Sequence, residues 1–175
     1  VNAEDEVIVP AMTYIATASA VLYQRAVPVF VDIERETFNL NPEKIEKAIS
    51  HKTKAILFID YGGNPAYIKE IIEIGEKKGI VVIQDAAQSL GGKYKGDNLG
   101  SQTLISTMSF HMAKVMTTVE GGMVLTHDDG LAEKIRIMRN QGEDPRRKYH
   151  HIMLGTNARM TDMQAAIGIE QFKKL

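Results

Sequence analysis

Hydrophobic residues occur along this chain in short runs that alternate with segments of helical periodicity. The runs "EVIVP", "VPVFVDI", "KAILFIDY" and "IVVIQDAA" are rich in Val, Ile and Phe. Between them, "TYIATASAVLYQ", "NPEKIEKAIS" and "PAYIKEIIEIGEKKG" carry apolar residues three and four positions apart, which is typical of helices. Continuous apolar strands separated by helices indicate a parallel sheet covered on both faces. The sequence therefore predicts an α/β fold with a mostly parallel sheet and helices on both faces.

The pattern changes after the fourth apolar run. The turn-rich "SLGGKYKGDNLG" precedes a long segment that is almost free of charge, and "GGMVLT" predicts one more strand. Periodicity predicts two further helices, near 128–140 and 161–174, on either side of a polar loop that contains "EDPRRKYHH". No internal repeat or low-complexity tract is present, which indicates a single globular unit.

Length and composition fit one domain over residues 1–175. The chain is 44% hydrophobic, and its 21 Lys and Arg residues balance its 22 Asp and Glu residues, so no large net field favours nucleic acid or an anionic membrane. The short "RRK" at 146–148 predicts a solvated loop. The absence of Cys excludes disulfides and thiolate metal sites. No long apolar stretch is present, so we expect a cytoplasmic protein without a nucleic-acid or membrane partner.

The chain begins with Val1, directly before a core-like strand, and we expect that it starts inside a larger protein.

Lys114 is the only formally charged residue between Asp97 and Glu120, although charged residues make up 25% of the sequence. Burying an ammonium group costs several kcal/mol unless it finds a partner or loses its proton. Lys114 is therefore either a structural anomaly or a nucleophile. Its apolar neighbours in the sequence are Met108, Phe110, Met112, Val115 and Met116.

Asp85 is a second isolated charge, the only one between Lys78 and Lys93, and it ends an apolar strand. Ligands of open parallel sheets bind beyond the carboxyl ends of strands, so Asp85 is expected to face a cation or a strong donor. Two alternatives stay open: the carboxylate caps the following turn, or it pairs with Lys114. A third possibility is that a cofactor binds between Asp85 and Lys114 and contacts both. Pyridoxal phosphate forms a Schiff base with lysine and needs a carboxylate to keep its ring nitrogen protonated.

Four segments closely resemble the DegT/DnrJ/EryC1/StrS family of nucleotide-sugar aminotransferases. In chain order they are "DEVIVPAMTYIATASAVLYQRAVPVFVDIE", "DAAQSLGGKYKG", "SFHMAKVMTTVEGG" and "GTNARMTDMQAAIGIEQ". The resemblance covers nearly the whole chain and implies the large domain of fold-type I pyridoxal-phosphate-dependent aminotransferases. Family members are longer, so residues 1–175 would be an incomplete large domain that lacks the preceding phosphate-binding segment and the C-terminal small domain.

The resemblance also implies the roles of individual residues. Lys114 would hold pyridoxal 5'-phosphate as a Schiff base and then move the substrate proton, while Asp85 would keep the ring nitrogen protonated. Further cofactor contacts would come from Gln88 to the ring hydroxyl, Tyr14 to the ring face, Ser109 to the phosphate, and Asn157 to the phosphate of the partner subunit's cofactor. From spacing alone, Tyr14 fits a core aromatic better than a stacking residue.

One departure from the family pattern, one related branch and two weaker motifs bear on this interpretation. Thr156 and Ala158 flank Asn157, where family members often have aromatic residues, so substrate contacts from that segment are not implied. A related branch of sugar dehydratases has histidine in place of the lysine, and Lys114 argues against that branch. "GGKYKGD" lacks the lysine of a phosphate-binding loop, and the adjacent histidines at 150–151 lack a third ligand, so no metal is expected.

The sequence therefore predicts a pyridoxal-phosphate-dependent aminotransferase. It would transfer an amino group from glutamate to a nucleotide-linked keto-deoxysugar, in the biosynthesis of surface polysaccharides or secondary metabolites. Its expected assembly is a homodimer with shared active sites. The alternative is a truncated, non-catalytic fragment that folds or dimerises without a complete site.

Overall fold

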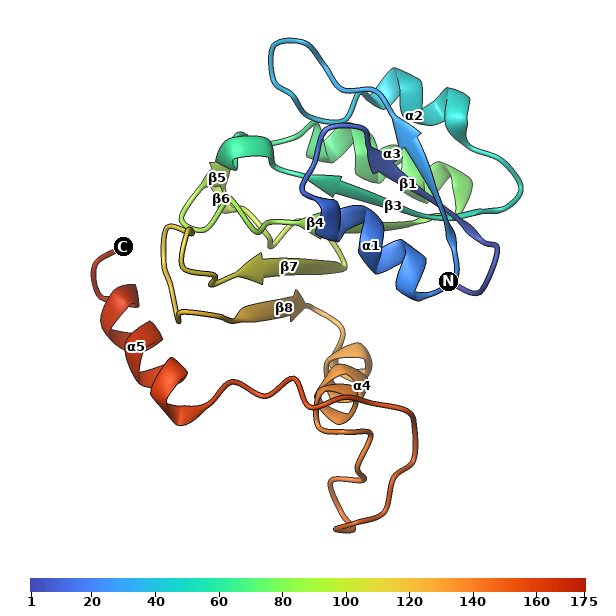
Figure 1. Ribbon diagram of the computed structural model, residues 1–175. Helices are drawn as coiled ribbons and strands as arrows, with labels where there is room; N and C mark the ends of the chain where they lie inside the picture. Colours follow the sequence, from blue (N-terminus) through green and yellow to red (C-terminus); the bar gives the residue numbers. More distant parts are fainter.

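The computed structural model describes all of residues 1–175 as an α/β fold (Figure 1). Its strands are β1 (Glu6–Pro10), β2 (Val27–Val31), β3 (Thr53–Ile59), β4 (Val81–Asp85), β5 (Lys93–Tyr94), β6 (Asp97–Asn98), β7 (Ile105–Ser109) and β8 (Gly122–Thr126). Its helices are α1 (Ile15–Tyr23), α2 (Pro42–Ala48), α3 (Ile68–Lys78), α4 (Asp129–Arg139), α5 (Asp162–Phe172) and the short 3-10 helix η1 (Tyr61–Gly63). The helices and strands predicted from periodicity are confirmed.

A six-stranded sheet in the order β2-β1-β3-β4-β7-β8 forms the centre of the molecule. Neighbouring strands are parallel from β2 to β7, and only β8 runs antiparallel, beside β7. In register, Asp85 of β4 lies opposite Ile59 of β3 and Thr107 of β7. The carboxyl ends of β3, β4 and β7 therefore meet at one edge of the sheet.

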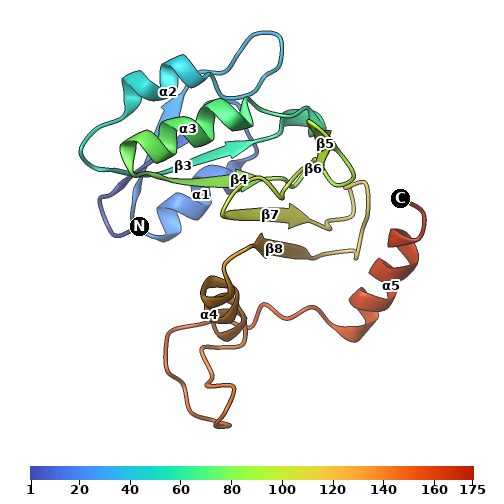
Figure 2. The same cartoon turned by 180° about the vertical axis from the view of Figure 1, so that it is seen from behind.

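Helices cover both faces of the sheet, as predicted. Alternate residues of a strand point to opposite faces, so Val7 and Ala55 pack with Val21 of α1, whereas Ile8 and Ile56 belong to the core below α2 and α3. α1 lies in front of the sheet in Figure 1, and α2 and α3 lie on the opposite face, which is turned to the viewer in Figure 2. The larger core lies on the side of α2 and α3.

The sequence pattern missed three strands. β7 lies inside the uncharged segment, where its serines and threonines hide the apolar signal, and β5 and β6 are too short to show a period. On the edge strands of the sheet, Phe30 of β2 and Met123 of β8 are exposed.

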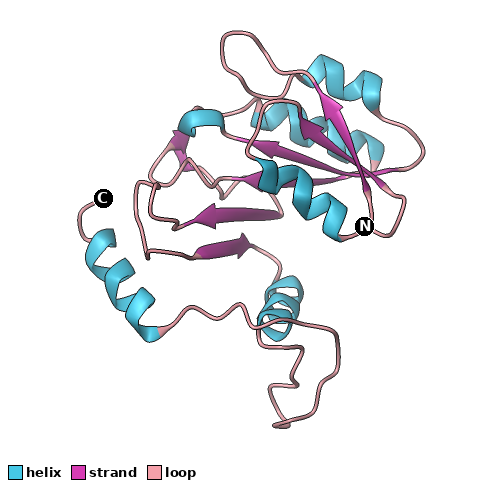
Figure 3. Cartoon of the chain, viewed as in Figure 1, coloured by secondary structure: helices cyan, strands magenta, loops and turns pink.

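The C-terminal part of the chain leaves the sheet. α4 follows β8, and a long loop, drawn in pink in Figure 3, leads on to α5 at some distance from the other helices. Thr161 caps α5 and exchanges hydrogen bonds with Gln164 in a capping box. No helix is long and apolar enough to cross a membrane.

Candidate active site

A cavity of about 910 Å3 lies beyond the carboxyl ends of the central strands. Its walls come from the start of α1, the ends of β3, β4 and β7, and the loop after β7. Of the residues predicted for the site, the cavity is lined by Lys114, Asp85, Gln88, Tyr14 and Ser109. Only Asn157 lies elsewhere. The fold thus brings together side chains that are separated by as much as a hundred positions in the sequence.

Lys114 reaches the cavity from the loop after β7, where its backbone N–H donates to the carbonyl of His111 over 2.9 Å. The lysine is half-buried, and the expected apolar surroundings are formed only in part. Phe110 is buried below the loop, but Met112 and Val115 are 69% and 65% exposed. Because this loop lies at the rim of the sheet, only some of the apolar neighbours of Lys114 are buried.

Asp85 ends β4 with both carboxylate oxygens bonded. Thr17 of α1 donates its hydroxyl to Oδ2 over 3.3 Å, and the backbone N–H of Ala87 donates to Oδ1 over 3.1 Å. The second bond shows that Asp85 also caps its own turn, the alternative left open by the sequence. No ion pair joins Asp85 to Lys114, so a direct pair is not formed. Both residues instead present their charges to the same cavity.

Gln88 is held by the short helix η1. Its Oε1 accepts from the backbone N–H of Gly62 over 2.6 Å. Gly63 has a φ of +80°, and a Cβ on it would lie 2.8 Å from the carbonyl oxygen of Gln88. Only glycine therefore allows the loop after β3 to approach the turn that carries Gln88 this closely.

Asp60 also lines the cavity, and the sequence pattern did not single it out. Asp60 directly follows β3, just as Asp85 ends β4. The sequence signal for Asp60 is therefore a second aspartate at the end of an apolar run. Asp60 is only 1% exposed. Burial raises its pKa above the ordinary value of 3.8; hydrogen bonds from Ala66, Gln84 and Ser89 oppose this rise, and the charge of Asp85 adds to it.

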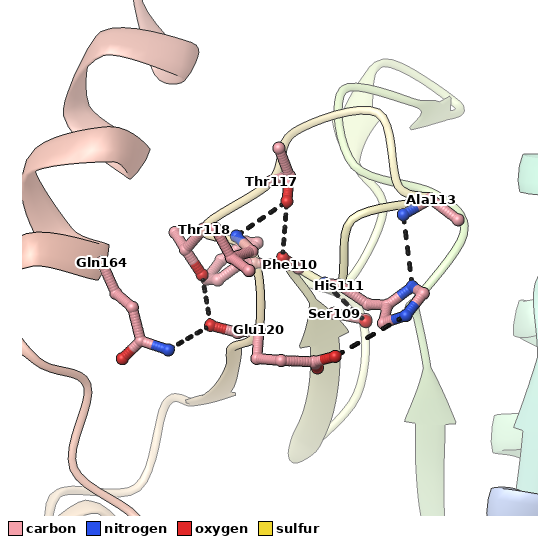
Figure 4. A network of polar contacts seen from close by, with 9 residues as sticks. Ser109, Phe110, His111, Ala113, Thr117, Thr118, Glu120 and Gln164 are labelled. Atoms are coloured by element: carbon pink, nitrogen blue, oxygen red, sulfur yellow. Dashed lines mark hydrogen bonds and ion pairs between the residues drawn. The ribbon is translucent and has the colours of Figure 1, made fainter.

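A network of polar contacts supports the loop that carries Lys114 (Figure 4). Ser109 accepts from the backbone N–H of His111 over 3.3 Å, and the backbone N–H of Ala113 donates to Nδ1 of His111 over 3.2 Å. Because Nδ1 accepts, the proton of the neutral imidazole lies on Nε2, which faces the Glu120 carboxylate at 3.7 Å. His111 and Glu120 line the cavity and were not predicted from the sequence.

α5 contacts the same loop from outside. The side-chain amide of Gln164 and the hydroxyl of Thr118 both donate to the carbonyl oxygen of Glu120 over 2.8 Å. A Cβ on Gly168 of α5 would lie 2.8 Å from the methyl group of Thr118, so this helix packs close to the loop only through a glycine. The start of α5 therefore contributes to the support of the cavity wall.

Tyr14 and Asn157 differ in their relation to the cavity. Tyr14 stands just before α1 and is 74% exposed at the rim, so the alternative of a core aromatic is wrong. Asn157 is exposed in the loop before α5, where it forms an isolated bridge with Asn140. It does not line the cavity of its own chain.

Comparison with known proteins identifies the family. A GDP-perosamine synthase from Caulobacter vibrioides is 45% identical over 98% of this chain and 46% of that protein. A UDP-2-acetamido-2-deoxy-3-oxo-D-glucuronate aminotransferase from Pseudomonas aeruginosa is 44% identical over 93% of this chain and 45% of that protein. A candidate sugar aminotransferase from Streptococcus pneumoniae, solved in its PLP form, has a TM-score of 0.93 and 32% identity over 99% of this chain and 50% of its own.

These proteins agree with the predicted fold and cofactor, since the S. pneumoniae protein has been solved in PLP and PMP forms. The chain spans about half the length of the curated relatives that it matches. The match to the family extends over residues 1–175. This chain therefore belongs to the DegT/DnrJ/EryC1/StrS aminotransferase family.

Proposed function

We propose that the protein containing this chain is a pyridoxal-phosphate-dependent aminotransferase that acts on a nucleotide-linked keto-sugar. The observation that carries the proposal is that Lys114 and Asp85, the two isolated charges of the sequence, line one cavity at the carboxyl edge of the sheet. An amine and a carboxylate around one ligand are what this cofactor requires of its protein.

The cavity fits the cofactor in size and in the kinds of group that line it. Its volume of about 910 Å3 lies within the usual range of small-molecule sites, and its walls offer an amine, a carboxylate, an amide and a hydroxyl. When bound, pyridoxal phosphate supplies an aldehyde for the amine and a ring that accepts electrons from the substrate. Thr17 and Ala87 would hold the Asp85 carboxylate in place.

Each predicted site residue has a proposed task. Lys114 would bind the aldehyde and later carry the proton at its Nζ, and Asp85 would hold the proton of the ring nitrogen. Because Gly62 already fixes its Oε1, Gln88 would turn its Nε2 to the ring hydroxyl. Tyr14, exposed at the rim, would cover the ring and exclude water, and Ser109 would bind the phosphate.

The substrate class follows from the relatives, which act on both GDP- and UDP-linked sugars according to their names. We propose glutamate as the amino donor and a deoxysugar for a polysaccharide or a secondary metabolite as the product. We further propose a homodimer in which Asn157 reaches the partner subunit's site. This is supported by the exposure of Asn157 away from the cavity of its own chain.

The alternative is a non-catalytic fragment of the large domain. It is favoured by the exposure of Met112 and Val115 beside Lys114. In that case the chain would fold and associate without holding the cofactor. Cofactor binding at Lys114 distinguishes the two possibilities.

The test is to incubate the protein with pyridoxal phosphate, reduce it with borohydride and locate the attached cofactor by mass spectrometry. We expect the label on Lys114 and no label in Lys114→Ala. Lys93→Ala, which removes an exposed lysine outside the cavity, is the matched control and should be labelled as in the wild type. A label on another lysine, or none, would refute the proposal.

A further inference from the structure

Asp60 is a buried carboxylate without a cationic partner. It is 1% exposed, and none of the ion pairs of the chain includes it. A buried carboxylate is costly, so it persists only where hydrogen bonds stabilise it or where its charge serves another group. None of the roles proposed above uses Asp60.

Hydrogen-bond donors surround this carboxylate. Ala66 donates its backbone N–H to Oδ1 over 3.1 Å. Gln84 and Ser89 donate to Oδ2 over 2.7 and 3.0 Å. All three groups donate, which matches an ionised acceptor rather than a protonated acid. This contact fixes the orientation of the Gln84 amide, whose buried Oε1 has no hydrogen-bond partner.

The donors come from the loop after β3 and from β4 with its turn, segments that also contribute Asp60, Asp85 and Gln88 to the cavity lining. Ala66 ends the loop after β3, Gln84 lies in β4, and Ser89 lies in the turn after β4. The same loop and turn meet again where Gly62 donates to Gln88. The backbone N–H of Asp60 also donates to the carbonyl of Asp85 over 3.4 Å. Asp60 therefore ties the loop after β3 to β4 and the following turn, which carry Asp85 and Gln88.

We propose that Asp60 is a positioning residue for the cofactor, which fixes the turn after Asp85 and supplies a second negative charge beside it. This inference rests on the function proposed above. Two neighbouring carboxylates favour a cation in the cavity more strongly than one, and a protonated pyridine ring is such a cation. Burial is the main reason why the pKa of Asp60 is raised, and the nearby charge of Asp85 adds to it.

Two variants separate the effect of the Asp60 charge from the effect of the packing of the loop around it. Asp60→Asn keeps the shape and removes the charge, and the unpartnered Oε1 of Gln84 offers the new amide an acceptor after an amide flip. Asn39→Ala loosens the same loop and alters no charge, because buried Asn39 bonds to Tyr61, Asn64 and Pro65. Both variants are compared with the wild type as full-length proteins.

The readout is the dissociation constant of pyridoxal phosphate, measured by absorbance titration over a range of pH. Above the pKa of the bound ring nitrogen, binding weakens as the ring loses its proton, which gives the profile an alkaline limb. In Asp60→Asn we expect binding about tenfold weaker and an alkaline limb that moves by about half a pH unit or more towards lower pH. Asn39→Ala should weaken binding without moving the limb.

Other titratable groups around the cavity are common to all variants, so they cancel in the comparison. They are Asp85 from β4, Tyr14 before α1, and His111, Lys114 and Glu120 from the loop after β7. The inference would be overturned if the alkaline limb of Asp60→Asn stayed at its wild-type position. It would also be overturned if the limb of Asn39→Ala moved as far as that of Asp60→Asn.

If Asp60→Asn shows no cooperative thermal unfolding, Asp60→Ser carries the test. Its hydroxyl can still accept a hydrogen bond from the surrounding donors but carries no charge, so the limb should again move towards lower pH. An unmoved limb in Asp60→Ser then overturns the inference. A wild-type protein that binds no cofactor refutes the proposed function and this inference together, whereas wild-type binding at Lys114 with an unmoved limb refutes this inference alone.

Discussion

The side-chain amide of Gln164, in the first turn of α5, donates to the carbonyl oxygen of Glu120 over 2.8 Å across 44 residues of sequence. The carboxylate of Glu120 faces His111, whose Nδ1 accepts from the backbone N–H of Ala113. Ala113 directly precedes Lys114. Polar contacts thus connect α5 with the loop that carries the lysine (Figure 4).

If this connection holds the loop in place, Gln164→Glu should weaken cofactor binding. A glutamate can still accept from Thr161 in the capping box, but it cannot donate to the carbonyl of Glu120. The loss of one hydrogen bond, about 1 kcal/mol, corresponds to roughly fivefold weaker binding of pyridoxal phosphate by titration.

Thr161→Ala is the matched control for this prediction. It breaks the capping box from the other side and leaves the amide of Gln164 in place, so it should lower the thermal stability by about 1 kcal/mol with little effect on cofactor binding. Wild-type affinity in Gln164→Glu would contradict a role of α5 in supporting the loop.

The role of Asp85 predicts a separation of binding from chemistry. Asp85→Asn should retain much of the cofactor but lose transamination by roughly a hundredfold or more, because a neutral amide does not hold the ring proton. The measurement is the rate of the half-reaction with glutamate in a single turnover.

Thr17→Val is the control for Asp85→Asn. It removes the hydroxyl that donates to Asp85 and keeps the carboxylate, so the rate should fall much less. If Asp85→Asn reacts as fast as the wild type, the carboxylate does not have the proposed role.

The raised pKa of Asp60 predicts a pH dependence of stability with a definite sign. Above pH 3.8 and up to its folded-state pKa, the folded protein binds more protons at Asp60 than the unfolded chain does. The contribution of Asp60 to the free energy of unfolding therefore falls as pH rises through this window, by about 1.4 kcal/mol for each pH unit between the two pKa values. Burial is the main cause of the raised pKa.

Asp60→Asn cannot titrate, so urea unfolding of the wild type and this variant at several pH values isolates the effect. The stability of the wild type relative to the variant should decrease from about pH 4 towards neutral pH. A constant difference, or one that increases with pH, would show that Asp60 does not have a raised pKa in the folded protein.

Much of the site could be predicted because its key residues stand out in the local sequence. Asp85 is an aspartate at the end of an apolar strand, and Lys114 is a cation in an uncharged segment. The position of Asp85 follows from the fold, which places the carboxyl ends of the strands at one edge of the sheet, where ligands bind. Asp60 has the same pattern, because it follows the apolar run of "KAILFIDY".

Other parts of the site cannot be recognised from the local sequence. The contact between Gln164 and Glu120 depends on how α5 packs, which is a tertiary property of residues far apart in the chain. The apolar character of Met112 and Val115 predicted burial, but their position at the sheet edge exposes them. Sequence pattern thus predicted the strand ends well and the loop environments poorly.

The proposed shared site predicts that two inactive variants restore each other. Lys114→Ala removes the amine, and Asn157→Ala removes the contact to the partner subunit's phosphate, so each homodimer should be defective. In a mixed dimer, one site combines the intact lysine of one subunit with the intact asparagine of the other. We expect mixing of the full-length variants to restore up to half of the wild-type activity per dimer, since the second site carries both defects.

Dilution provides an independent measurement of the same linkage. If association completes the site, cofactor affinity should fall when the protein is diluted through the dissociation range of the dimer, because binding and association then stabilise each other. Sedimentation gives the range, and Asn157→Ala should abolish the dependence by removing the contact between subunits. A monomer that binds the cofactor tightly, or mixed variants that exchange subunits without regaining activity, would show that each chain forms its site alone and that Asn157 at its exposed bridge to Asn140 has a structural role only.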